Sequence, residues 1–470
     1  MVQMKSEQAF NLRFVWRVSL VAAMGGLLFG YDWVVIGGAK PFYEEFFHLR
    51  TPFQIGWAMS SALAGCLLGA VLSGLLSDRF GRKRLLILTA VLFTFSALGT
   101  GWSQSFSTFL WYRVLGGLGI GLASVLSPLY IAELAPAPMR GKFVSINQLT
   151  IVIGLGAQFI NWLIAQPVAE GATSLEILNS WNGQTGWRWM FAAEAVPAVL
   201  FCILALLLPE SPRWLVKSGS DKLARQILER IGGGTYAQSA LAEVRASLAQ
   251  ETAQVDFREL LEPGMVRILS LGVFLAVFQQ WCGINTIFYY ADEIFAAAGY
   301  GVSDVLLNIV ITGGVMMVFT FVAIRTVDRW GRRPLMLVGA FGLATVYLFV
   351  GLSYRFSFQG LPILLLVVAA IALYSFTLAP VTWVLISEIF PNRLRGAAMS
   401  VAVFGLWAGC ITLTYTFPFL NASLGTAGTY WLYAVVCAMG FLVMRRHLVE
   451  TKGKTLEQIE RDLLTESLSP

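Results

Sequence analysis

Two side chains of opposite charge lie inside apolar stretches of this sequence. Asp32 lies in "LLFGYDWVVIGG" (27–38), within a run of apolar and small residues that begins at Val18, and Arg113 lies in a second apolar run, 107–134. An acid at the centre of a membrane helix costs about 2.5–3.5 kcal/mol on insertion scales. Asp32 lies about six positions before the end of its run and Arg113 about six positions after the start of its own, and both of these ends are predicted to face outward, so each residue lies roughly 9 Å below the outer surface. The shared depth predicts that Asp32 and Arg113 form a pair.

Such a pair has two possible uses, and the residues alone leave both open. The acid can accept and release a proton, which would make the pair a switch. Alternatively, the pair can stay ionised and simply hold two helices together. Glu194 is a further acid in an apolar run, about one turn past Arg188, where it can form a local ion pair or join the buried charges.

Three amides in another apolar run form a second group of side chains that could bind a ligand. Gln279, Gln280 and Asn285 lie in "FQQWCGINTIFYY" (278–290), with Gly283 between them. Unpaired polar groups in lipid cost several kcal/mol each, so a cluster of amides is expected to have a use. The spacing places these amides in part on one helical face, and the glycine eases a local break. Convergent amides of this kind suit a ligand rich in hydroxyl groups.

Other chemistry finds little support in the sequence. His48 and His447 are the two histidines and lie far apart, so neither a metal site nor a catalytic histidine arrangement is expected. The stretch "GKT" (453–455) lacks the glycine of a phosphate-binding loop. "GGLGIG" (116–121) lies in an apolar run with no flanking strand, and its small residues are expected to let helices approach closely. The sequence therefore predicts no enzyme, no cofactor and no metal.

The composition identifies the element that must position these groups as a membrane helix. The 470 residues are 57% hydrophobic and 13% charged, whereas soluble domains have about 25% charged residues. About twenty apolar residues span a bilayer, and about twelve such segments are present. They are 16–38, 54–76, 85–104, 107–134, 143–165, 189–208, 266–290, 303–326, 335–354, 361–390, 397–420 and 428–446. We expect an all-α membrane protein whose first apolar run is a span rather than a cleaved signal.

The positive charges predict how the helices are oriented. With the N-terminus in the cytoplasm, 28 of the 33 lysines and arginines fall in cytoplasmic segments, as the positive-inside rule requires. The net charge of +6 is thus a topology signal, and no nucleic-acid partner is expected. Both termini are predicted to be cytoplasmic.

Two pairs of similar segments indicate an internal repeat. "SDRFGRKRLLIL" (77–88) returns as "VDRWGRRPLMLV" (327–338), and "AELAPAPMRGKFVSIN" (132–147) returns as "SEIFPNRLRGAAMSVA" (387–402). A parallel repeat of six spans is one known way to build a transporter. We therefore expect an N-terminal six-helix half (1–208), a cytoplasmic linker with short helices over 220–231 and 236–251 (209–265), a C-terminal six-helix half (266–446) and a cytoplasmic tail (447–470).

The chain resembles the sugar porter branch of the major facilitator superfamily, from about residue 18 to 460. The resemblance rests on motifs in the family's order: "FGYD" (29–32), "DRFGRKR" (78–84), "NQL" (147–149), "PESPRWL" (209–215), "FQQWCGINTIFYY" (278–290), "DRWGRR" (328–333), "WVLISEIFPNRLRG" (383–396) and "ETKGKTLE" (450–457). It implies the major facilitator fold with twelve transmembrane helices and alternating access by rocking of two halves.

The resemblance also assigns roles to the charged motifs. It implies a cytoplasmic charge network that closes the inner gate in the outward-facing state, made of Asp78, Arg79, Arg82, Glu133, Arg140, Asp328, Arg329, Arg332, Glu388 and Arg395. The alternative is that these charges only anchor the topology. Proton-coupled members of the family carry an acid at the position of Asp32, paired with the arginine at Arg113, and the acid at Glu194 is discussed as a helper.

The substrate site is likewise carried over from the family. The resemblance implies sugar binding by Gln148, Gln279, Gln280, Asn285 and Trp383, cavity walls at Phe29 and Trp407, and an outer gate at Tyr289 and Tyr290. Three positions that are often polar in the family are apolar here, namely Leu155, Met316 and Leu406. The pocket is therefore expected to offer fewer hydrogen bonds than those of the best-matched pentose carriers.

The predicted function is proton-coupled symport of a monosaccharide, a pentose or a hexose, across a bacterial inner membrane by a monomer embedded in the lipid bilayer. The alternative is a facilitative sugar or polyol uniporter in which Asp32 is structural. A carrier for another solute keeps the same fold with a different pocket. A non-transporting sugar sensor would be expected to have a longer cytoplasmic tail than 445–470.

Overall fold

The computed structural model describes residues 10–169, 171–251, 257–391, 394–454 and 458, and everything regular in those ranges is helical. The first six helices are α1 (Leu12–Phe46), α2 (Pro52–Phe80), α3 (Arg82–Gly101), α4 (Phe106–Leu134), α5 (Arg140–Gly154) and α6 (Ala157–Ile164), with the short turn η1 (Ala137–Met139) before α5. These are followed by α7 (Ser174–Asn179), η2 (Asn182–Gly186), α8 (Trp187–Ala192) and α9 (Ala195–Leu206).

The remaining helices begin with the polar linker. They are α10 (Pro212–Lys217), α11 (Asp221–Glu251), η3 (Phe257–Leu261), α12 (Pro263–Trp281), α13 (Ile284–Tyr289), α14 (Ala291–Ala297), α15 (Val302–Trp330), α16 (Arg332–Arg355), α17 (Leu361–Phe376), α18 (Leu378–Ile389) and α19 (Arg395–His447). Within α11, Gly232 and Gly233 leave the helical conformation. The two linker helices that we predicted therefore meet at these glycines.

Eleven helical stretches among the described residues are long and apolar enough to cross a membrane. One of them, α19, has 53 residues and contains a non-helical residue, Gly425, at φ 67°. Two predicted spans, 397–420 and 428–446, lie on either side of this glycine. The all-α membrane fold and its apolar segments are confirmed.

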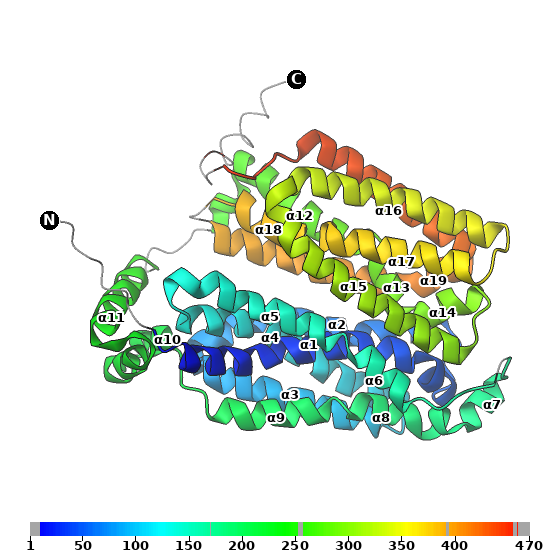
Figure 1. The fold of residues 1–470 in the computed structure, drawn as a ribbon, viewed down its shortest axis with the longest axis horizontal. Coiled ribbons are helices and arrows are strands. Elements are labelled where there is room, and N and C mark those ends of the chain that lie inside the picture. The colour runs from blue at the N-terminus through cyan, green and yellow to red at the C-terminus, as the bar shows by residue number, and fades with distance from the viewer. Residues whose placement is uncertain (1–9, 170, 252–256, 392–393, 455–457, 459–470) are drawn as a thin grey trace. The chain divides into compact units, whose positions relative to one another are not determined.

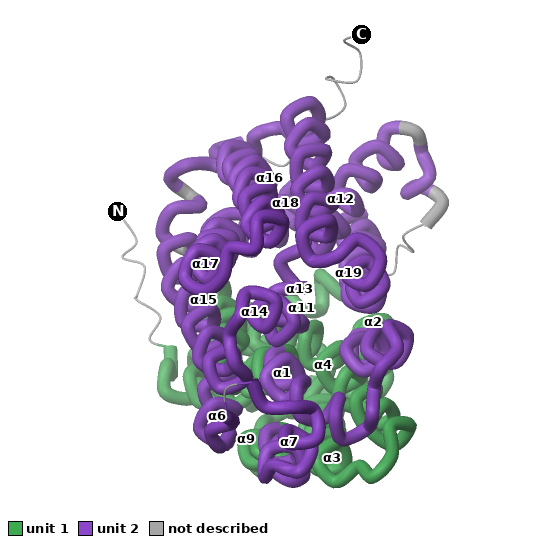
Figure 2. The backbone as a smooth tube through the Cα atoms, turned by 90° about the vertical axis from the view of Figure 1, so that its right-hand side faces the viewer, with its two compact units in different colours: residues 1–33, 64–157, 191–254 green, residues 34–63, 158–190, 255–470 purple. Residues whose placement is uncertain are grey.

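The chain forms two compact units, coloured in Figure 2. Unit 1 comprises residues 1–33, 64–157 and 191–254, and unit 2 comprises 34–63, 158–190 and 255–470. Helix α1 thus contributes its first part to unit 1 and its last part to unit 2. The division of the chain into two six-helix halves stays a prediction.

Unit 1 is built on α3, which packs against α4 and α9. Phe109 of α4 meets Phe191 edge to face, with ring centroids 5.8 Å apart. A Cβ added to Gly121 of α4 would lie 2.2 Å from the carbonyl oxygen of Cys66 in α2. The small residues of 116–121 therefore allow the close helix contact that the sequence predicts. Figure 1 shows α10 and α11 at one end of these long helices.

Unit 2 is centred on α19, which packs against α12 and α16. Three fully buried tyrosines fill the space between α16 and α19, because the Tyr347 ring lies 5.5 Å from that of Tyr430 and 6.4 Å from that of Tyr433. Helix α15 packs against α17. The last part of α1 belongs to this unit as well and lies beside α13 and α14.

Candidate functional site

Asp32 of α1 and Arg113 of α4 form an ion pair in unit 1, between Oδ1 of the acid and Nη1 of the guanidinium. Asp32 is 1% exposed and Arg113 2% exposed. Helix α4 begins at a capping serine, since the Ser105 hydroxyl accepts a hydrogen bond from the backbone N–H of Thr108 at 3.2 Å. The pairing that was predicted from matching depth is confirmed.

Glu194 lies beside this pair. It is 2% exposed and interacts electrostatically with both Asp32 and Arg113. Among the described residues, Oδ2 of Asp32 and Oε1 of Glu194 have no hydrogen-bond partner. Gly116 of α4 lies beside this site: a Cβ there would lie 3.8 Å from Asp32 Oδ2 but only 2.3 Å from the Ser96 hydroxyl oxygen, so the close approach to Ser96 requires the glycine.

This buried charge site (Asp32, Arg113 and Glu194) has the composition of a proton-binding site. Two carboxylates face one guanidinium, so the fully ionised group carries one negative charge in excess. One bound proton makes the group neutral, and each acid keeps an oxygen that can take it. A membrane interior favours neutral groups over charged ones. The arrangement can therefore couple proton uptake to a change in the pairing of Arg113.

The three amides of the seventh apolar run form one hydrogen-bonded chain in unit 2. Asn285 donates to Gln280 Oε1, and Gln280 donates to Gln279 Oε1 at 3.4 Å. Gln279 in turn donates to the carbonyl oxygen of Ala379 on α18 at 3.2 Å. All three side chains are at most 4% exposed. The sequence predicted that these amides lie in part on one helical face. It did not reveal that they bond to one another.

Gly283 is the reason that the amides meet. It has φ +87° and separates α12 from α13, so the helix that carries Gln279 and Gln280 ends before the one that carries Asn285. This left-handed conformation is one that glycine adopts at little cost. A side chain there would also collide with the Tyr433 ring, which lies 2.7 Å from the ideal Cβ position.

The predicted aromatic residues have different surroundings. Tyr290 is fully buried; its hydroxyl donates to the carbonyl oxygen of Thr414 at 2.6 Å, and its ring stacks on Phe417 at 4.4 Å. Tyr289 and Trp407 are also buried, whereas Trp383 on α18 is 44% exposed. These four residues belong to unit 2. Gln148, which is exposed, and Phe29, which is half-buried, belong to unit 1.

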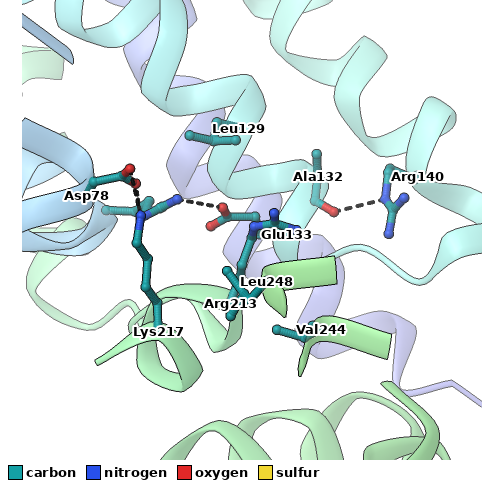
Figure 3. A pocket seen from close by; sticks show the side chains of 10 residues that line it. Asp78, Leu129, Ala132, Glu133, Arg140, Arg213, Lys217, Val244 and Leu248 are labelled. Carbon is teal, nitrogen blue, oxygen red and sulfur yellow. Dashed lines mark hydrogen bonds and ion pairs between the residues drawn. The ribbon is translucent and has the colours of Figure 1, made fainter. Parts of the chain in front are cut away.

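The charge cluster of the first repeat, predicted to be cytoplasmic, lies entirely within unit 1. Arg82 bonds Glu133 at 3.0 Å and Asp78 at 3.3 Å, and Lys217 of α10 bonds Asp78 at 2.8 Å. Arg140 donates to the carbonyl oxygen of Ala132 at 3.0 Å. Figure 3 shows these side chains around a cavity of about 540 Å³. Arg79 has a different role, because its guanidinium lies over the Phe80 ring at 5.3 Å.

Unit 2 repeats the same pattern. Arg332 bonds Glu388 at 3.0 Å, as Arg82 bonds Glu133. Arg395 donates to a backbone carbonyl as Arg140 does, but to that of Phe390 at 3.3 Å, which is not the repeat counterpart of Ala132. The carbonyl oxygen of Arg329 accepts a bond from Lys452. The side chain of Asp328 lies outside the described part of the structure. Whether these clusters act as an inner-gate latch stays a prediction.

Two glutamates in these clusters were missed by the sequence reasoning. Glu210 accepts hydrogen bonds from the backbone N–H groups of Arg82 and Lys83 at 2.9 and 3.1 Å, at the start of α3. Glu450 does the same for Arg332 and Arg333 at 3.0 and 3.1 Å, at the start of α16. The signal was available, because "ES" (210–211) and "ET" (450–451) follow the sixth and twelfth apolar segments alike.

The neighbouring hydroxyls complete the symmetry. Ser211 donates to Glu133, and Thr451 donates to Glu388. Partial burial acts to raise the pKa of the Glu450 carboxyl, but hydrogen bonds from the backbone N–H groups of Lys452, Arg332, Arg333 and Thr451 outweigh it and hold that pKa below its ordinary value. The charges of Glu210 and Glu450 also lie at helix N-termini, those of α3 and α16, where the helix dipole stabilises them.

Comparison with known proteins was made against families, curated sequences and solved structures. Residues 18–463 match the family described as "Sugar (and other) transporter". The D-xylose-proton symporter of Escherichia coli (strain K12) is 38% identical over 483 residues, which cover 96% of either chain. The glucose transport protein of Synechocystis sp. is 40% identical over 472 residues, covering 97% of this chain and 98% of that protein. The xylose transporter XylE from E. coli, in an inward open conformation, matches with a TM-score of 0.82 at 37% identity, covering 95% and 99% of the two chains.

Proposed function

We propose, from the premise that this chain belongs to the sugar transporter family of the major facilitator superfamily, that it carries one monosaccharide together with one proton. The protein is an integral membrane transporter and not an enzyme. The transport proceeds by alternating access across a bacterial inner membrane. The protein acts as a monomer with both termini in the cytoplasm.

The observation that carries proton coupling is the buried charge site. A symporter needs one acid that reaches the solvent on alternate sides and whose charge biases the conformation. For the first part, Asp32 keeps a carboxylate oxygen, Oδ2, that no described residue bonds and that can take the proton once alternating access exposes this buried site. Its pairing with Arg113 meets the second part, because a proton on the acid weakens the pair between α1 and α4. A ligand shifts an equilibrium only through different affinities for the two states.

Sugar recognition rests on the amide chain of unit 2. Asn285, Gln280 and Gln279 present donors and acceptors that a sugar hydroxyl can replace one for one. Trp383 and Trp407, which belong to the same unit as the amides, complete the part of the proposed pocket that unit 2 supplies. Leu155 and Leu406 are buried apolar residues at positions that often carry amides in relatives, so the bound sugar forms fewer hydrogen bonds here. A pentose or a hexose fits this chemistry, and the compared relatives are named for xylose and for glucose.

The decisive experiment uses the purified protein in liposomes with an inward pH gradient. Single sugars are added outside, and pH is followed while uptake of labelled sugar is measured. The symporter accumulates one sugar above equilibrium and makes the outside medium more alkaline. Asp32→Asn should abolish uphill accumulation and spare sugar exchange. Asp304→Asn is the matched control, because Asp304 is an exposed acid at the start of α15, and it should behave as the wild type.

The opposite result has a clear meaning. If the wild-type protein takes up sugar only to equilibrium without proton movement, the protein is a facilitative uniporter. Asp32 is then a permanently ionised bridge to Arg113, and Asp32→Asn lowers stability without changing the driving force.

A further inference from the structure

A fully buried lysine lies near the last turns of α1, away from the charge site. Lys40 is 0% exposed. Its ammonium nitrogen lies 2.8 Å from a carboxylate oxygen of Asp292, 2.9 Å from one of Glu293 and 3.2 Å from one of Glu44. Neither the proposed proton site nor the proposed sugar site uses this lysine. A lysine is almost never fully buried unless it is paired, and here it has three acidic partners.

The acidic partners come from distant parts of the sequence. Lys40 and Glu44 lie on α1, directly after the first apolar run, whereas Asp292 and Glu293 lie on α14, directly after the seventh. All four belong to unit 2. Asn421 of α19 holds Glu293 in place by donating to it at 3.0 Å. The cluster therefore ties the end of α1, a helix of the first repeat, to helices of the second repeat.

Two further contacts show how closely α1 lies against this partner. A Cβ added to Gly37 would lie 2.4 Å from the carbonyl oxygen of Phe288 on α13, so only a glycine fits there. The Lys40 ammonium also lies 5.4 Å from the centre of the Tyr290 ring, a distance at which cation–π attraction operates. Tyr290 is one of the two residues predicted for the outer gate. The lysine is therefore placed at that gate, between α1 and α14.

We propose that Lys40, Glu44, Asp292 and Glu293 form an outer lock, which closes the external side of the transport path by ion pairs made only while α1 lies against α14. This inference rests on the proposed function in one respect, namely that the protein works by alternating access. For the path to open outward, the end of α1 must leave α14, and the lysine must exchange two carboxylates for water. Lys40 is thus a positioning residue of the transport cycle.

Removing the positive charge should open the lock rather than merely loosen it. Without the lysine, three carboxylates face one another in a buried place, and each is costly to bury unpaired. Separation of α1 from α14 hydrates them and removes the repulsion. A neutral side chain at position 40 should therefore shift the protein toward its outward-open state.

The lock also contains more acid than base. The titratable and charged groups that face Lys40 are Glu44 and Tyr43 on α1, Asp292 and Glu293 on α14, and Tyr290 before α14. Burial raises the pKa of the Asp292 carboxyl above its ordinary value of 3.8, and the attraction of Lys40 offsets this only in part. A group whose pKa is higher in the closed state takes up protons on closing. Falling pH should therefore favour the closed lock.

The test measures a distance in the full chain and requires neither sugar nor a proton gradient. Spin labels are placed at Leu175→Cys, on α7, and Phe356→Cys, after α16; both positions are exposed. The native cysteines are buried or half-buried and serve as the unlabelled background. Pulsed electron resonance on protein in lipid nanodiscs then reports the separation of the two outer loops.

Lys40→Met should make a longer distance the main population, and Lys40→Arg, which keeps the charge, should retain the short one. Asp292→Asn should stay closed, since Glu44 and Glu293 remain, and should lose part of the pH dependence of the wild type. Arg50→Met is the matched control: Arg50 is 57% exposed by side chain and pairs with Glu45, and exposed pairs contribute little. It should leave the distances unchanged.

The proposal is overturned if folded Lys40→Met shows the wild-type distance distribution, or if Lys40→Arg opens the protein as Lys40→Met does. Sugar binding to solubilised Lys40→Met, measured by tryptophan fluorescence, keeps the two proposals apart. An open lock with sugar binding intact supports the lock and agrees with the proposed sugar site. An open lock in a protein that moves no protons leaves the lock standing and refutes only the symport.

Discussion

At the scale of single residues, three groups of buried polar side chains are paired with one another before any ligand arrives. Asp32 has Arg113, Gln280 has Asn285, and Lys40 has three acids. The first pair could be predicted, because two opposite charges at one depth have few other options. The third could not, because Asp292 and Glu293, two of the three partners of Lys40, lie on α14, and no local pattern encodes the contact of α14 with α1.

The amide chain allows a residue-scale prediction. Asn285→Ala removes the donor to Gln280 Oε1 and one donor for the sugar. A buried acceptor left without its partner costs about 1–3 kcal/mol, so the affinity for sugar should fall by roughly 5- to 150-fold. Titration calorimetry on the purified variant measures this change. Asn179→Ala is the control, because Asn179 is an exposed amide at the end of α7; an equal loss of affinity there would contradict the role of Asn285.

At the scale of elements, the two long helices α3 and α16 begin in the same unusual way. Each follows a glycine with positive φ, Gly81 at 89° and Gly331 at 91°, and each lacks a capping side chain of its own. A distant glutamate supplies the cap instead. Repeats in the sequence predicted that the two motifs are equivalent. They did not predict the cap, because a local capping rule searches the residues next to the helix start, whereas Glu210 lies 128 residues from Arg82.

This arrangement predicts a pH-dependent stability. Glu450 has a lowered pKa in the folded protein, so the stability that its charge contributes is present above the ordinary pKa of 4.5 and is lost as pH falls through the folded value. Glu450→Gln should lower stability at pH 7 by about 1 kcal/mol, as loss of a cap does. The melting temperature of this variant in detergent should approach that of the wild type as pH falls below about 4.5.

Glu262→Gln is the matched comparison for this variant. Glu262 precedes α12 and is exposed, and its side chain makes no capping bond. The same change of charge there should leave the melting temperature within the error at pH 7. If both variants lose the same stability, the cap that Glu450 provides to α16 is not the cause.

At the scale of the whole molecule, the distribution of positive charge and the repeat agree on one topology. The repeat also predicts which segments are equivalent, and the equivalent clusters of Arg82 and Arg332 confirm it. The repeat does not predict which end of a helix packs against which other helix. For this reason the residues 34–63 and 158–190, which belong to unit 2, could not be assigned from the sequence.

The topology can be checked with single cysteines and a maleimide that does not cross membranes. In right-side-out vesicles, Gln359→Cys, in the exposed segment between α16 and α17, should react. Lys222→Cys, exposed on α11, should react only after the vesicles are opened. The unmodified chain sets the background. The reverse pattern of labelling would place the termini outside and would contradict the positive-inside assignment.

Lys40 is synthesised long before two of its three partners. Asp292 follows it by 252 residues, which at roughly 5–20 residues per second takes a ribosome about 10–50 s. During that interval Glu44, one turn further along α1, is the only acid of the outer lock that the growing chain contains. The first helix thus enters the bilayer with a counter-ion of its own, Glu44, and Lys40 keeps this partner when α14 emerges and adds Asp292 and Glu293.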